Sequence, residues 1–171
     1  MTTTTQSPTN LQLPVGLWRI DPVHSTVGFE VRDMTHLMAS IHGRFTDFDG
    51  SLDVTSGGVR AQGTVHVASL TTDNAERDED MRSPRFLDAG SSPTIRFESE
   101  TVESTGSDAF RMAGRLTFKG TASDIELDGV VLGSGTDHSG TERLAIAATG
   151  LLPFGPMQVK LVLDVSAIKA S

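Results

Sequence analysis

Short runs in which apolar and polar residues alternate make up most of this chain. One run places Val27, Phe29 and Val31 on one face, and another extends from Val59 to Val67. Successive side chains of a β-strand point to opposite sides, so a run of period two forms a strand with one apolar face. From Gly16 onward there are about eight to nine such runs, with glycines in many of the turns. The sequence therefore predicts an all-β domain, either an antiparallel barrel or a sandwich.

Residue sizes on the inward faces help to choose between these two architectures. The chain has eight Phe, one Trp and no Tyr, and several inward positions are small: Ala61, Gly63, Gly114 and Ala148. A barrel of about eight strands encloses either packed side chains or one small ligand. Small inward residues leave volume, so we interpret the pattern as a barrel with a hollow interior.

Composition bounds the domain organisation and excludes several classes of partner. A length of 171 residues suits one domain, which we place at 15–171 after a flexible polar tail at 1–14. The formal net charge of -8 argues against nucleic-acid binding and against an anionic membrane surface. The chain has no cysteine, no transmembrane stretch and no recognisable signal peptide, so a cytoplasmic location is expected.

Two stretches resist the strand period and are expected to be short helices. One is Asp33–Ser40, and the other is RDEDMRSPRFLD, Arg77–Asp88. Thr72 or Asp73 can cap the second helix, whose acidic first turns suit a helix N-terminus, and Ser83-Pro84 ends it. This stretch lacks the ligand spacing of a calcium loop. Its Arg77 and Asp78 form either a solvated ion pair or a pair that anchors the helix over a barrel opening.

Histidines raise the question of catalysis or metal binding. His24 precedes Ser25 and follows Asp21, but neighbours on a strand face opposite ways and no nucleophile elbow occurs. His36, His42 and His66 lack the spacing of a metal site. We expect no catalytic residue, no metal and no cofactor, and we interpret His24 as a hydrogen-bonded structural or mouth-lining residue.

Several ordered blocks of the chain together resemble one known family. They read WRIDPVHSTVGFEVRD, IHGRFTDFDGSL, ASLTTDNAERDEDMRSPRFLDAGSSPTIRFESE and GRLTFKGT. Through these blocks, which run over roughly 17–169, the chain resembles the YceI-like polyisoprenoid-binding family. The matching positions include Asp21, Pro22, His24 and Ser25; Gly43, Arg44, Phe45, Phe48, Asp49 and Gly50; Arg77, Asp78, Ser83, Pro84, Phe86, Asp88, Pro93 and Phe97; and Gly114, Leu116, Thr117 and Gly120.

The resemblance implies a lipocalin-like extended antiparallel β-barrel whose apolar tunnel holds an isoprenoid chain. It implies a non-enzymatic binding, storage or transport protein for a polyprenyl compound or isoprenoid quinone, and a homodimer. The sequence departs from the family pattern at Asp33, Leu87 and Leu151, where the family usually has His, Phe and Arg. These departures bear on the polar contacts to the head group.

Candidate ligand contacts follow from the apolar strand faces. The candidates for the tunnel lining are Trp18, Ile20, Val27, Phe29, Val31, Val65, Val67, Ile95, Phe97, Leu116, Phe118, Leu144, Ile146, Leu161 and Leu163. The polar candidates, for a mouth or a structural motif, are Asp21, His24, Arg44, Arg77 and Asp78. Two alternatives stay open: a lipid-modifying enzyme that uses His24 at the barrel mouth, and a structural or interaction module whose barrel is filled by its own side chains.

Overall fold

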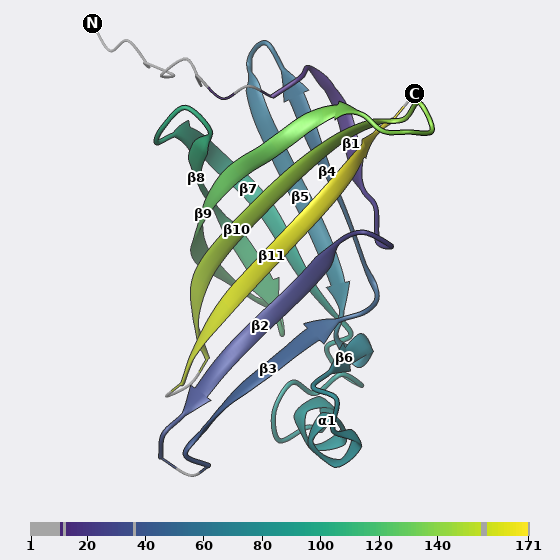
Figure 1. Ribbon diagram of the computed structural model, residues 1–171. Coiled ribbons are helices and arrows are strands. Elements are labelled where there is room, and N and C mark those ends of the chain that lie inside the picture. Colours follow the sequence, from purple (N-terminus) through teal and green to yellow (C-terminus); the bar gives the residue numbers. More distant parts are fainter. Residues whose placement is uncertain (1–10, 12, 36, 155–156, 171) are drawn as a thin grey trace, which may run out of the picture.

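The computed structural model describes residues 11, 13–35, 37–154 and 157–170. Eight antiparallel strands form a closed ring, because β1 pairs with both β4 and β11 (Figure 1). In ring order they are β1 (Gly16–Ile20), β4 (Phe48–Thr55), β5 (Gly58–His66), β7 (Thr94–Ser104), β8 (Ala109–Phe118), β9 (Thr121–Thr136), β10 (Glu142–Phe154) and β11 (Met157–Lys169). The predicted lipocalin-like barrel of about eight strands is confirmed.

Three further strands extend the sheet from β11: β2 (Thr26–Asp33), β3 (Ala39–Phe45) and β6 (Leu70–Thr71). The long strand β11 pairs with β1 near its end and with β2 near its start, so β1 and β2 follow each other along one edge of β11. A 3-10 turn, η1 (Val67–Ser69), connects β5 to β6, and the helix α1 (Ala75–Arg82) follows. Figure 1 shows β2, β3, β6 and α1 together at the lower end of the barrel.

Helix α1 confirms one of the two predicted helices, with a corrected start. The side chain of Asn74, rather than Thr72 or Asp73, caps the helix by accepting from the backbone N–H of Arg77 at 3.0 Å. Asp73 has a positive φ of 61° just before the cap. Ser83 forms the C-cap, as the Ser-Pro pair predicted.

The helix predicted over Asp33–Ser40 is wrong. Strand β2 continues to Asp33 and β3 starts at Ala39, with Arg32 opposite Ser40. The described residues between the two strands form a turn, and Met38 has a positive φ of 50°. An isolated helix of two turns has little stability of its own, whereas strand pairing satisfies these backbone groups directly.

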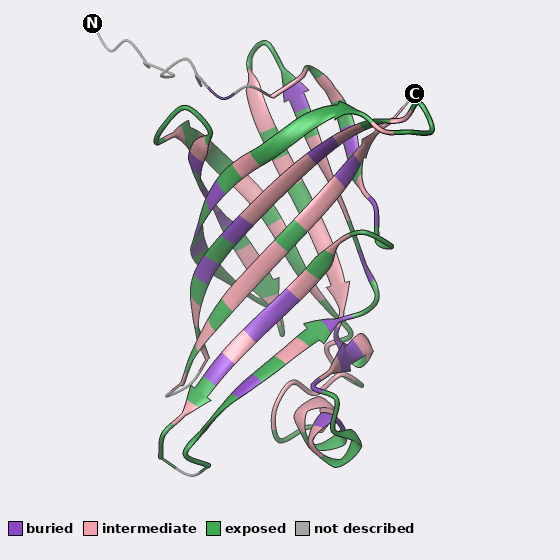
Figure 2. Cartoon of the chain, viewed as in Figure 1, coloured by how far each residue is buried: buried purple, intermediate pink, exposed green. Residues whose placement is uncertain are grey.

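Two irregularities in the ladders adjust which residues face inward. The pairing of β7 with β8 shifts between Ser99 and Thr101, so the inward set passes from odd residues such as Phe97 to even ones such as Val102. The pairing of β9 with β10 shifts at Ala145 and Ile146. Buried or intermediate positions alternate with exposed ones along much of β7 and in the middle of β9, and Figure 2 shows this alternation as bands of colour on several strands.

The barrel interior divides into a filled end and an open end. At the filled end, Trp18 is 1% exposed and Leu144 is 0% exposed, and they pack with Val54 and Ala167. A second buried cluster continues this packing and consists of Leu11, Phe110, Met112, Ile125, Leu127 and Ala148. The open end contains the third cluster, Phe29, Val31, Ile41, Phe45 and Leu70. Residues 1–10 and 12 of the expected flexible tail lie outside the described residues, and the flexibility of this tail stays a prediction.

Candidate ligand cavity

An apolar cavity of about 370 Å³ lies at the open end of the barrel. Strands, the turn between β2 and β3, and helix α1 with the loop after it all contribute to its wall. Its lining consists of Phe29, Val31, Asp33, Leu37, Ile41, Phe45, Leu70, Arg77, Asp80, Met81, Phe86, Leu87, Ile95, Leu116, Phe118, Thr121, Ser123, Leu152, Pro153, Phe154, Met157, Val159 and Leu161. Only three of these residues carry a charged side chain, Asp33, Arg77 and Asp80, so the cavity suits an apolar ligand with at most a small polar part.

Helix α1 is fastened to β6 through buried polar contacts around Thr72. The Asp78 carboxylate accepts hydrogen bonds from the backbone N–H and the hydroxyl of Thr72. The Arg77 guanidinium donates from Nε to the Thr72 hydroxyl at 2.8 Å and from Nη2 to the Thr72 carbonyl at 2.9 Å. Arg77 and Asp78 therefore meet at Thr72, which makes them an anchor for the helix over the opening rather than a solvated pair.

The charge of Asp78 is stabilised despite its burial. Burial raises the pKa of this carboxyl, but hydrogen bonds from Thr72 and Thr71, with the nearby charge of Arg82, hold that pKa below its ordinary value. Arg82 also donates to the Leu70 carbonyl at 2.8 Å. The side of the helix that carries Asp78 is thus fixed by charge-assisted hydrogen bonds.

The loop after α1 brings Phe86 and Leu87 to the cavity. The Leu87 N–H donates to the Met81 carbonyl at 3.0 Å, and the Lys119 ammonium donates to the Phe86 carbonyl at 2.7 Å. Arg85 lies over the Phe86 ring, and Lys119 lies over the Phe118 ring at 5.5 Å. Two cations therefore flank aromatic rings of the cavity wall.

The structure brings six of the fifteen apolar candidates to the cavity: Phe29, Val31, Ile95, Leu116, Phe118 and Leu161. The other nine do not line it. Trp18 and Leu144 belong to the filled end, Val67 is fully buried beside β6, and the remainder are Ile20, Val27, Val65, Phe97, Ile146 and Leu163. Contact of any of these residues with a ligand stays a prediction.

The polar candidates separate in the same way. Arg77 lines the cavity, and Asp78 lies buried behind it. Arg44 lies outside, with its guanidinium 3.4 Å from the Asp73 carboxylate. Asp21 and His24 lie in the connection between β1 and β2 and do not line the cavity.

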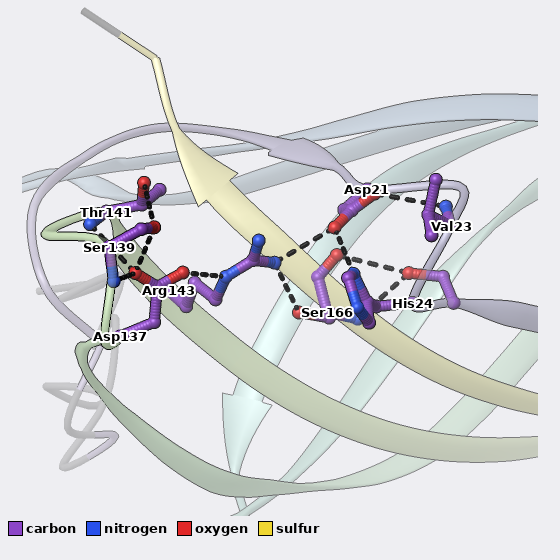
Figure 3. Close-up of polar contacts among 9 residues, drawn as sticks. Asp21, Val23, His24, Asp137, Ser139, Thr141, Arg143 and Ser166 are labelled. Atoms are coloured by element: carbon purple, nitrogen blue, oxygen red, sulfur yellow. Dashed lines mark hydrogen bonds and ion pairs between the residues drawn. The ribbon is translucent and has the colours of Figure 1, made fainter.

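Asp21 instead organises a polar network on the filled end (Figure 3). Its Oδ2 atom lies 2.7 Å from His24 Nδ1 and accepts from Arg143 Nη1 at 2.9 Å. Arg143 also donates from Nε to Asp137 at 2.6 Å. The bonds from His24 and Arg143 lower the pKa of Asp21 to about 2, against the opposing effect of burial. Bonds from the Ser139 hydroxyl and from Arg143 also hold the pKa of Asp137 below its ordinary value.

The contacts of this network hold strands together and do not form a catalytic dyad. The Ser25 hydroxyl donates to the Ser166 carbonyl at 3.1 Å and accepts from the Ser166 N–H at 2.9 Å, so it is bound to backbone rather than to His24. The network joins the β1–β2 connection to β11 and to the start of β10. Within the described part of the chain, no three His, Asp or Glu side chains gather as a metal site, and no helix is long and apolar enough to cross a membrane.

Most residues that sequence reasoning missed come from hairpin ends and from the α1 region. They are Leu37, Ile41, Phe45, Leu70, Met81, Phe86, Leu87, Leu152, Pro153, Phe154, Met157 and Val159, with the polar Asp33, Asp80, Thr121 and Ser123. Met157 and Val159 share the face of Leu161. Leu152 and Phe154 share the face of Leu144. Ile41 and Phe45 share one face of β3, so alternation could have indicated these six residues. No periodic signal marks the residues of turns and of α1, whose place depends on tertiary packing.

Comparison with known proteins agrees with this architecture. A sequence profile described as the YceI-like domain matches residues 18–167. A UPF0312 protein of Pseudomonas paraeruginosa is 30% identical over 141 residues, which cover 81% of this chain and 72% of that protein.

Solved structures with low sequence identity share the fold. Burkholderia cenocepacia BcnA matches with a TM-score of 0.74 and 17% identity, over 86% of this chain and 98% of that chain. A polyisoprenoid binding domain from Saccharophagus degradans, implicated in plant cell wall breakdown, matches with a TM-score of 0.64 and 13% identity, over 92% of this chain and 100% of that chain. With the matched profile covering most of the chain, we conclude that this protein belongs to the YceI-like family.

Proposed function

We propose that this protein binds, stores or transports a long-chain isoprenoid, a polyprenyl compound or an isoprenoid quinone, without catalysing a reaction on it. The observation that carries the proposal is the apolar cavity of about 370 Å³ at the open end of the barrel. Small-molecule sites typically measure roughly 300–1,000 Å³ and are lined mainly by apolar side chains with few polar groups. The solved polyisoprenoid binding domain of similar fold supports the choice of ligand class.

The binding energy would come from removing the isoprenoid from water. Each buried methylene contributes roughly 0.8 kcal/mol before the costs of ordering and association. Three charged side chains, Asp33, Arg77 and Asp80, belong to the wall, where they would meet a head group or exclude one of the wrong charge.

The packing of the barrel limits how the ligand can lie. Trp18 and Leu144 close the filled end, and Phe110 and Met112 pack in the cluster next to it. A chain longer than the cavity would therefore extend out through the open end rather than run through the whole barrel. The expected tunnel becomes, in this proposal, a cavity with one entrance.

The alternatives have less support. A lipid-modifying enzyme would need His24 beside the ligand, but His24 is absent from the cavity wall and its partner Asp21 also binds Arg143. A barrel filled by its own side chains would not leave this cavity.

The proposal is tested by lipid extraction and by uptake. Protein purified under native conditions is expected to release a polyprenyl species detected by mass spectrometry, and lipid-free protein is expected to take up geranylgeraniol. Protein that carries no lipid and takes up none would overturn the proposal.

Two adjacent positions on β9 provide a matched pair of variants. Both are exposed, but Ser123 lines the cavity and its neighbour Ala122 does not. Ser123→Trp is expected to weaken geranylgeraniol uptake by about tenfold, equivalent to about 1.4 kcal/mol, because the indole occupies part of the cavity. Ala122→Trp is expected to leave uptake unchanged, and equal effects of the two variants would argue against this cavity as the site. The homodimer and the cytoplasmic location stay predictions, to be checked by sedimentation and by cell fractionation.

A further inference from the structure

Large apolar side chains are exposed beside the cavity opening. The turn between β2 and β3 exposes Met34 (57%), Leu37 (58%) and Met38 (66%), and Leu151 near the end of β10 is 56% exposed. Because β2 pairs with β11 at Val31 and Val159, this turn and the β10–β11 hairpin lie at the same end of the barrel (Figure 1). Three exposed large apolar residues in one short turn exceed what scattered surface residues would produce, and such a patch marks an interaction site.

We propose that these four residues, Met34, Leu37, Met38 and Leu151, form an apolar lip that docks the cavity opening onto the surface of a lipid bilayer. This inference rests on the proposed function, since it gives an isoprenoid a route between a membrane and the cavity. The lip meets the cavity wall at Leu37, which belongs to both, and Leu151 directly precedes the wall residues Leu152, Pro153 and Phe154 on β10. An isoprenoid that passes along this path stays in contact with apolar side chains.

The charges around the opening indicate which side faces the bilayer and what kind of bilayer it is. Glu76, Glu79 and Asp80 are exposed on α1. Figure 1 shows α1 apart from the turn between β2 and β3. The exposed Arg32 lies on β2 two residues before Met34, and the exposed Lys160 lies on β11 opposite Leu151, where cationic side chains can reach the head groups. With a net charge of -8, the protein gains little from anionic lipid. Docking therefore depends on apolar insertion and favours a zwitterionic surface.

The test compares two triple variants of the full chain in sedimentation with vesicles of phosphatidylcholine. The first, M34S/M38S/L151S, removes exposed lip residues that do not line the cavity. The control, V15S/V23S/L132S, removes residues of similar exposure, 62%, 82% and 61%, that lie away from the lip. We expect the first variant to lose about tenfold in vesicle partitioning, the control to match the unmodified protein, and added salt to have little effect.

Geranylgeraniol binding in solution separates this inference from the proposed function. The lip variant is expected to bind geranylgeraniol as the unmodified protein does, which supports a separate docking surface. If it loses geranylgeraniol and vesicles equally, the lip belongs to the ligand site and the inference falls. If the unmodified protein binds geranylgeraniol but not vesicles, docking fails while the proposed function stands. If it binds vesicles through the lip but no isoprenoid, docking stands while the proposed function fails.

Two further results would overturn the docking surface. Sedimentation velocity that shows a dimer for the unmodified protein and a monomer for the lip variant, with no vesicle binding by either, would assign the lip to a second copy of the chain. Stronger partitioning to vesicles that contain phosphatidylglycerol, lost at high salt, would assign membrane binding to charge rather than to apolar insertion.

Discussion

Both ends of the barrel pack a phenylalanine ring against a glycine of the neighbouring strand. Phe110 lies opposite Gly129 at the filled end, and Phe29 lies opposite Gly43 at the open end. A Cβ atom added to either glycine would come within 2.3 Å of the ring's Cζ atom. Phe110 is surrounded by buried neighbours such as Ile125 and Leu127. The ring centroid of Phe29, in contrast, lies 5.5 Å from that of Phe45, and Phe29 also lines the cavity.

The comparison shows that small inward residues do not themselves make the barrel hollow. Gly114 makes room for the Phe97 ring, and Ala148 packs in the cluster next to the filled end. None of the small inward residues that suggested a hollow interior, Ala61, Gly63, Gly114 and Ala148, lines the cavity. The cavity lies instead where β2, β3 and α1, which stand outside the closed ring of strands, face residues of β7 to β11.

The largest expected effect separates a leucine of the filled end from one of the cavity wall. Leu144→Ala is expected to lower the free energy of unfolding by about 2–5 kcal/mol, because the removed side chain is completely buried and leaves a new void. Leu161→Ala is expected to cost less, because its side chain already borders a cavity. Urea unfolding measures both, and equal losses would show that the two ends do not differ in packing.

The two glycines give a second, smaller contrast. Gly129→Ala is expected to cost about 1–3 kcal/mol, because the Phe110 ring has no free space to move into. Gly43→Ala is expected to cost less stability but to weaken geranylgeraniol uptake, because the Phe29 ring can yield into the cavity. Urea unfolding and ligand titration are measured on both variants. Unchanged uptake in Gly43→Ala with a large loss of stability would contradict this account.

The smallest expected effect on stability comes from acid titration, which tests the polar network around Asp21 at the filled end. The pKa of Asp21 is lowered from 3.8 to about 2 in the folded protein. The ionised carboxylate therefore stabilises the fold at pH values above about 4, by at most about 2 kcal/mol, and this contribution is lost as the pH falls toward 2. The stability of the Asp21→Asn variant is expected to depend less steeply on pH in that range. The urea midpoint of unfolding, measured at several pH values, follows this dependence. An unchanged slope would mean that other carboxyls govern acid unfolding.

Sequence patterning predicted the barrel well because alternation reports directly on which strand face is buried. It identified the inward faces of β8 and β10, including Leu116 and Leu144, and it identified α1. It could not show that Leu144 fills one end while Leu116 borders a cavity, because both positions look alike in a period-two pattern. That difference depends on where α1 and the hairpin turns pack against the barrel.

Hydrogen-bond partners that lie far apart in the sequence were equally hard to predict. The local contact of Asp21 with His24 falls within one block of the chain, but Arg143 lies 122 residues away from Asp21. Only the antiparallel register of β10, β11 and β1 brings that guanidinium to the carboxylate. The same applies to Lys119, which reaches the Phe86 carbonyl across 33 residues.

Strand β11 has a consequence for how the protein folds. It pairs with β10 along one edge and with β1 and β2 along the other, so three strands each lack one neighbour until it is in place. Since β11 follows the other ten strands along the chain, the barrel cannot close until all of them have been synthesised. Closure joins Trp18 to Lys169, nearly the whole length of the chain, and such non-local pairing makes folding slow. During that interval the unpaired edges of β1, β2 and β10 are the surfaces most exposed to aggregation.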